Sequence, residues 1–193
     1  IDLYEGKLIL GRKETLDACL NFFAQRLRYL YERSGFRYDF INASLQAGVD
    51  DVYLSYLRLK ALEELKSSPA FEPFILMVRR VNNILRGQPA FKLTEALLGE
   101  KAEQELHSTF KIIRENALPL IEEGDFSRAQ KMAFKLQNPL NNFFDKVLVM
   151  AEDKKLRQNR LALLQEIRNF LFKIADFSQI VLEGERENKK EKA

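Results

Sequence analysis

Apolar residues recur every three or four positions along almost the whole chain, and no segment alternates with a period of two. This spacing places apolar side chains on one face of an α-helix, whereas a half-buried strand would alternate. Of the 193 residues, 46% are hydrophobic and 31% are charged, which is enough to build a sizeable core beneath a charged surface. The pattern therefore predicts an all-α fold, a bundle of helices.

Helix-capping residues divide the pattern into segments. A first long helix carries an apolar stripe of Leu16, Leu20, Phe23, Leu27 and Leu30, and Gly35 ends it. Further helices are expected at about 39–47, from Asp50 or Asp51 to about Lys66, at about 71–86, 100–123 and 125–136, from Asn138 and Pro139 to about 151, and from Asp153 to about 182. Pro119 should kink the 100–123 helix or split off its last turn, because proline lacks the backbone N–H.

The later helices carry stripes that we expect in the core. They are Phe74, Val78, Val81 and Leu85; Ala102, Leu106, Phe110, Ile113 and Ala117; Phe126, Ala129, Ala133 and Leu136; and Leu140, Phe144, Val147 and Ala151. The helices at 100–123 and 125–136 should form an antiparallel hairpin, because the connection between them is short.

The two ends of the chain differ from this helical domain, which we place at 14–183. Residues 1–13 are interpreted as a linker from an upstream domain. Residues 184–193 contain no apolar residue except Ala193, so they cannot recover the entropy of ordering and are expected to form a mobile charged tail.

Few residues offer catalytic or metal-binding chemistry. One cysteine, Cys19, and one histidine, His107, are too few soft ligands for a zinc site. His107 lies beside Ser108 in a helical segment, where a surface histidine is a better explanation than a catalytic triad. The glycines are scattered rather than grouped into a phosphate-binding loop. We therefore expect no active site and no cofactor in this chain.

No apolar run approaches the roughly 20 residues that span a bilayer. With a single cysteine, this predicts a cytoplasmic protein that does not insert into membranes. The net charge of +3 is mild, so any contact with nucleic acid should be local.

Arginine and asparagine recur at helical spacing, which is typical of binding. Arg79, Asn82 or Asn83, and Arg86 project from one side of a helix, with Arg80 nearby. Such planar donors suit phosphates and the edges of unstacked bases, although the spacing taken alone favours an ordinary solvated face.

The last helix carries a second set, Arg157, Asn159, Arg160 and Arg168. Arg160 falls on the apolar stripe of that helix, where an unpaired charge would be costly, so we expect an ion pair with Asp145 or Asp176. The aromatic residues Phe143, Phe144, Phe170 and Phe172 could stack on bases, but phenylalanines at helical spacing are more often core.

Several blocks, taken in order, resemble a known family. Residues 141–180 contain FFDKVLVM, LRQNRLALL and ADFS, while FFAQRLRYLYERSGFRYDFINASL occupies 22–45 and RRVNNIL occupies 79–85. In this order and combination, the sequence from about Leu16 to Leu182 resembles the C-terminal part of bacterial glycyl-tRNA synthetase beta subunits.

This resemblance implies an α-helical anticodon-binding domain of the type shared with arginyl-tRNA synthetases. The partner would be glycine tRNA, and the active site of this ATP-dependent class II ligase would lie in a separate alpha subunit, contacted through the rest of the beta subunit. Glycine anticodons end in two cytosines, in which O2 and N3 accept hydrogen bonds and N4 donates.

The resemblance also implies which residues contact tRNA. Arg79, Arg80 and Asn83 match the family block and are the leading candidates, and Arg26 and Arg28 are expected to contact phosphates. The expected set is completed by Asn82, Arg86, Arg157 and Asn159. We expect these groups to converge on one accessible hollow.

An alternative of another class is a helical protein-interaction module without RNA binding. The segment GDFSRAQ at 124–130 is typical of one turn of a helical-repeat hairpin. No period of about 34 residues recurs elsewhere, which argues against a repeat protein.

Overall fold

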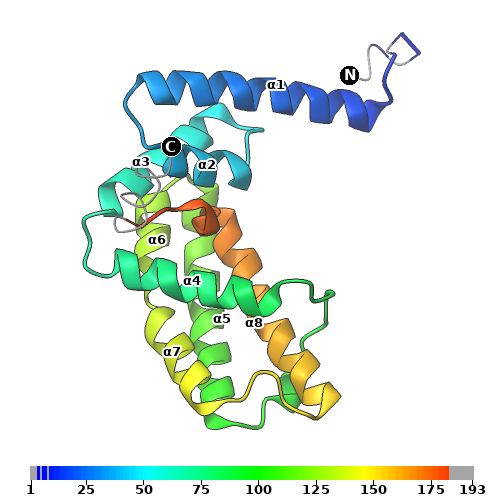
Figure 1. Cartoon of the computed structure of the whole chain (residues 1–193), viewed down its shortest axis with the longest axis vertical. Coiled ribbons are helices and arrows are strands. Elements are labelled where there is room, and N and C mark those ends of the chain that lie inside the picture. Colours follow the sequence, from blue (N-terminus) through cyan, green and yellow to red (C-terminus); the bar gives the residue numbers. More distant parts are fainter. Residues whose placement is uncertain (1–3, 5, 8, 183–193) are drawn as a thin grey trace, which may run out of the picture.

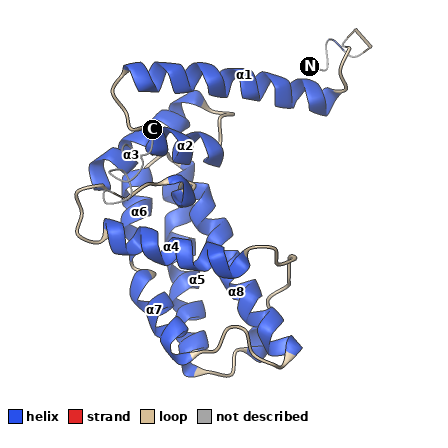
Figure 2. Ribbon diagram, viewed as in Figure 1, coloured by secondary structure: helices blue, strands red, loops and turns tan. Residues whose placement is uncertain are grey.

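The computed structural model describes residues 4, 6, 7 and 9–182, and all long regular elements in that part of the chain are helical. They are α1 (Arg12–Arg33), α2 (Tyr38–Ala47), α3 (Val52–Leu65), α4 (Phe71–Leu85), α5 (Lys101–Glu122), α6 (Phe126–Phe134), α7 (Gln137–Lys146) and α8 (Lys154–Ile174), with 3₁₀ turns η2 (Glu95–Leu97) and η3 (Phe177–Gln179) (Figures 1 and 2). The predicted all-α fold is confirmed. The expected tail at 184–193 lies outside the described residues.

The helices α5 and α6 form the predicted hairpin, against which α3, α7 and α8 pack. The turn between them needs Gly124, whose φ of +80° lies in the left-handed region. A Cβ at this position would also approach Leu57 Cδ1 of α3 to 2.8 Å. The GDFSRAQ turn therefore packs against α3 instead of presenting a repeat surface to solvent.

The helix α4 packs against α7 and α8, and α1 lies across one end of the molecule on α2 (Figure 1). The stripes predicted for α4, α5 and α6 are all buried, as expected from their helical spacing. Asp51, Asp125 and Asp153 each accept a backbone N–H at the start of a helix, as predicted from their positions. None of the described helices combines the length and the apolar character needed to cross a membrane.

The prediction that the apolar stripe of α1 lies in the core is wrong for most of the helix. Leu27 is buried, but Leu16, Phe23 and Leu30 are exposed, and α1 has no buried residue before Leu27. The periodicity predicted the helix correctly. It could not show that α2 and α3 cover only the C-terminal turns of α1, where Tyr31 hydrogen-bonds to Ser55 at 2.8 Å.

The ends of three other helices also differ from expectation. The helix α5 is not split at Pro119 and continues to Glu122. In and just after α7, Leu140 and Val147 of the predicted stripe are buried, but Phe143 is the buried aromatic residue and Phe144 is only partly buried. The last helix stops at Ile174 instead of about 182, because Asp176 caps a separate turn.

Arg160 is buried, as its position on the apolar stripe predicted, but its partner is neither Asp145 nor Asp176. Its Nε donates to Oε1 of Glu103 in α5 at 2.5 Å, and Nη1 donates to the Leu148 carbonyl at 2.9 Å. Glu103 is also buried and accepts the N–H of Glu100 at 2.9 Å. The pair therefore joins the first turn of α5 to α8 and to the segment before α8.

We predict that Glu103→Gln lowers the free energy of unfolding by about 3–5 kcal/mol, because it leaves a buried guanidinium without its counterion. Urea denaturation of the 193-residue chain measures this. Glu166→Gln is the control, since Glu166 pairs with Arg114 at a half-exposed site and its loss should cost at most about 1 kcal/mol. Equal effects of the two substitutions would contradict a structural role for the buried pair.

Candidate nucleic-acid interface

An open groove of about 550 Å³ lies between α4, α8 and the η3 turn. It is lined by Val78, Val81 and Asn82 of α4 and the following Arg86, by Arg168, Asn169, Leu171 and Phe172 of α8, and by Ala175, Asp176, Phe177 and Ser178. The helix α4 therefore meets α8 and the segment that follows α8 at one groove, which has both apolar and polar walls.

Helical spacing explains how the two helices supply the polar groups. Arg168 and Phe172 are four residues apart in α8, so they share a helix face. Asn82 lies in the last turn of α4, and Arg86 is the capping residue that follows the helix. Phe172 is 44% exposed, which leaves its side chain available for stacking. The groove thus has an aromatic surface beside guanidinium and amide donors.

Two of the hydrogen-bond donors in the groove, Arg86 and Arg168, carry positive charge. Within the described residues, Arg86 donates to Asn83 Oδ1 at 2.8 Å and Arg168 donates to Asn169 Oδ1 at 3.4 Å. Both acceptors are neutral amides, so neither contact pairs a guanidinium with a carboxylate, and both charges can attract an anionic ligand.

Asp176 places a carboxylate among these donors. It caps η3, where Oδ1 accepts the N–H and the hydroxyl of Ser178, and Oδ2 accepts the Gln179 side chain at 3.0 Å. Because a carboxylate has about four lone-pair sites, it can still accept a hydrogen bond from a ligand. A groove with donors, a carboxylate and an exposed ring matches a nucleobase better than a bare phosphate.

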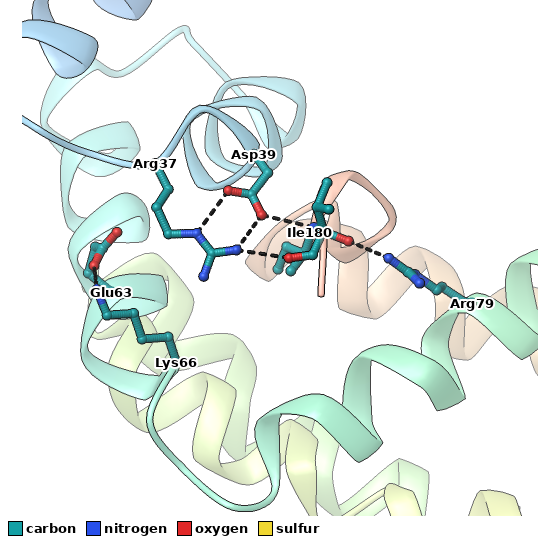
Figure 3. A network of polar contacts seen from close by, with 7 residues as sticks. Arg37, Asp39, Glu63, Lys66, Arg79 and Ile180 are labelled. Carbon is teal, nitrogen blue, oxygen red and sulfur yellow. Dashed lines mark hydrogen bonds and ion pairs between the residues drawn. The ribbon is translucent and has the colours of Figure 1, made fainter. Parts of the chain in front are cut away.

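None of the three leading candidates lines this groove, whereas Asn82 and Arg86 of the wider expected set do. Arg79 is half-buried, and its Nη2 donates to the Ile180 carbonyl at 2.7 Å (Figure 3). Arg80 lies over the Phe144 ring of α7 at 4.2 Å, and Asn83 accepts from Arg86 beside the groove. The basic pair in the RRVNNIL block is therefore divided between two other contacts.

Arg26 and Arg28 lie on α1, which contributes no residue to the groove lining. Arg26 is exposed and lies over the Phe22 ring at 5.1 Å, while Arg28 donates to the side chain of Asn42 in α2. Their expected phosphate contacts stay predictions, on a surface separate from the groove.

Arg157 and Asn159 hold loops in place. Arg157 donates to the Ala151 carbonyl at 2.8 Å. Asn159 is buried, and its Oδ1 accepts the Thr94 N–H at 2.7 Å, which fixes the segment between α4 and α5. Convergence of all the predicted groups on one hollow is therefore not what the structure shows.

Sequence reasoning did not propose Asn169, Asp176 and Ser178 as binding residues, and it assigned Phe172 to the core. The signal available was the Asp-Phe-Ser sequence at 176–178, since Asp and Ser two residues apart favour a local turn over a helix. No three His, Cys, Asp or Glu side chains among the described residues are grouped so that they could hold a metal ion.

The fold and this groove define an all-helical domain with a surface suited to unpaired nucleobases. The sequence model of the DALR anticodon binding domain matches residues 76–180, more than half of the chain and all of the groove lining. The chain belongs to the DALR anticodon binding domain family.

The chain is also similar to curated relatives named glycine–tRNA ligase beta subunit. The protein of Moorella thermoacetica is 41% identical over 163 residues, which are 84% of this chain and 24% of the relative. Those of Sulfurihydrogenibium and Syntrophus aciditrophicus are 34% and 32% identical over 93% and 95% of this chain, and 27% of each relative. The chain thus spans about a quarter of the length of these relatives.

We predict that Asn159→Ala and Asn169→Ala, ten residues apart in α8, have opposite consequences. Asn159→Ala should lower the free energy of unfolding by about 1–3 kcal/mol, because it leaves the Thr94 N–H without its acceptor. Asn169→Ala, at an exposed groove position, should leave stability unchanged and weaken binding of an RNA hairpin. Denaturation and fluorescence anisotropy measure the two effects, and the reverse pattern would contradict this division of roles.

Proposed function

We propose that the chain is the tRNA-binding domain of a glycine–tRNA ligase beta subunit and that it recognises the anticodon region of glycine tRNA. The observation that carries the proposal is the groove between α4, α8 and η3, which lies wholly within the DALR anticodon-binding match. The names of the curated relatives support glycine as the amino acid.

The groove has the chemistry that an unpaired cytosine requires. Arg86 or Arg168 can donate to the acceptors O2 and N3, and Asp176 can accept from the N4 amino group. Phe172 offers a ring on which a base can stack. A double helix presents its base edges only within its grooves, so this recognition requires bases that are unstacked, as in an anticodon loop.

The catalytic step would lie elsewhere. In this proposal, aminoacylation takes place in a separate alpha subunit, and the present domain, working in the cytoplasm, contributes tRNA selection. The alpha subunit is reached through the rest of the beta subunit, since the curated relatives are about four times as long as the match.

An anticodon hairpin with two cytosines at the second and third anticodon positions tests the proposal. We expect the 193-residue chain to bind it with an affinity that falls steeply as salt rises. Arg168→Met and Arg86→Met should each weaken binding by about tenfold or more, without changing the circular dichroism spectrum. A hairpin with uracil in place of both cytosines should bind more weakly, because Asp176 then faces the O4 acceptor.

Arg128→Met, an exposed arginine of α6 paired with Asp125, is the matched control and should leave binding unchanged. Equal affinity for the cytosine and uracil hairpins would contradict base recognition in this groove. Retention of a protein partner after nuclease treatment, with no tRNA bound, would favour the protein-interaction alternative.

We propose that the rest of the beta subunit contacts the exposed side of α1. Leu16, Phe22, Phe23, Tyr29 and Leu30 are 46–56% exposed, a large apolar area for one helix. The match to the Syntrophus relative covers 95% of this chain, so α1 belongs to the shared region, while 73% of that relative lies outside the match. Arg26 and Arg33 border the apolar side chains, which favours an apolar partner surface with an acidic rim.

Cys19 reports on this contact, because it is exposed and lies three residues after Leu16 and four before Phe23. We predict that a maleimide labels Cys19 at least about tenfold more slowly in a complete beta subunit containing this domain than in the isolated chain. Peptide mass spectrometry measures the rate. Equal rates would contradict the contact, and protection of the isolated chain that rises with concentration would indicate a second copy instead.

A further inference from the structure

The third wall of the groove belongs to the segment 175–181, of which residues 175–178 line the groove. After α8 ends, Ala175 is extended (φ −164°, ψ 157°), and residues 175–181 contain regular structure only in the three-residue turn η3. Some of its backbone groups bond within the segment, and others bond to neighbouring elements, as the Asp176 N–H does to the Ala43 carbonyl at 2.9 Å. The position of this wall depends on contacts from α2 and α4.

On one side, the segment is held by a buried carboxylate. Asp39 is fully buried and accepts the Val181 N–H at 2.8 Å. Arg37 donates to both oxygens of Asp39, at 3.0 and 2.6 Å, and also to the Val181 carbonyl at 2.9 Å. The pair thus binds both the N–H and the C=O of Val181.

On the other side, Arg79 reaches the same segment from α4. Its bond to the Ile180 carbonyl is 2.7 Å long, and a charged donor makes such a bond stronger than a neutral one. Arg79 lies three residues before Asn82 and seven before Arg86, so one region of α4 both anchors the segment and lines the groove. The contact fixes the distance between two groove walls.

We infer that Arg79 is a positioning residue of the RNA groove, which holds the 175–181 wall with Asp39 and Arg37 and does not itself contact RNA. The inference rests on the proposed function and deepens it, because it assigns the placement of Asp176 and Ser178 in the groove to a contact outside the groove. A wall held in place before binding needs no ordering when the RNA arrives, which increases affinity.

The salt dependence of RNA binding distinguishes this role from a phosphate contact. With the cytosine hairpin, Arg79→Met should weaken binding by about tenfold while the slope of log affinity against log salt stays that of the unmodified chain. A lost phosphate contact would instead reduce the slope by about one. Arg114→Met removes the same charge at the half-exposed pair with Glu166 and should change neither quantity.

Substitution of Asp39 provides a second test, because a charge effect and a positioning role predict opposite changes in RNA affinity. Removing a negative charge near a polyanion should strengthen binding if only charge mattered. A positioning role predicts that Asp39→Asn weakens binding, because the Val181 N–H and Arg37 then lose a charged acceptor. Val181→Pro removes the N–H that Asp39 accepts and leaves the charge unchanged. It replaces Asp39→Asn in this test if Asp39→Asn does not fold.

Hydrogen exchange of residues 175–181, measured without RNA, completes the test. Faster exchange in Arg79→Met and in Val181→Pro, together with weaker binding at an unchanged salt slope, is the expected result. A slope reduced by about one with unchanged exchange would overturn the inference in favour of a phosphate contact, and unchanged affinity would overturn it as well. If the unmodified chain bound no RNA, the proposed function would fail, and exchange alone would still decide whether Arg79 holds the wall.

Discussion

The groove depends on how the short segment 175–181, which follows α8, is held against α2 and α4. Residues 175–178 line the groove. Besides the bonds within residues 175–181, backbone groups of this segment bond to Ala43, Asp39, Arg37 and Arg79. Phe177 adds an apolar anchor, because its ring packs edge to face on Phe74 at 5.1 Å. Without these contacts, α4 and α8 would still pack, but the carboxylate of Asp176 would have no fixed place between their arginines.

This arrangement divides the arginines into two kinds. Arg37, Arg79 and Arg160 bond to carbonyls and buried carboxylates, so their charges stabilise the fold. Arg86 and Arg168 bond only to neutral amides among the described groups, and they face the groove. A mild net charge of +3 is therefore compatible with a locally basic site, because Arg37 and Arg160 are paired with buried carboxylates whereas, in the described part of the chain, Arg86 and Arg168 are not.

Much of the fold could be predicted from the sequence, because helical periodicity and capping residues are local signals. The buried stripes of α4, α5 and α6 and the caps at Asp51, Asp125 and Asp153 follow from such signals. The candidate site could not be predicted in the same way. Helical spacing shows which residues share a face but not what the face contacts, so Arg79 and Arg86 looked alike although one meets the chain and the other the groove. The exposure of α1 likewise depends on which neighbours are present.

The central claim is that unpaired bases bind in the groove between α4, α8 and η3. Hydrogen exchange of the 193-residue chain, with and without the cytosine anticodon hairpin, tests it most directly. The account predicts that RNA slows exchange in residues 78–86 and 168–178 and leaves residues 12–26 of α1 unchanged. Protection confined to α1, with no change at the groove, would contradict the account.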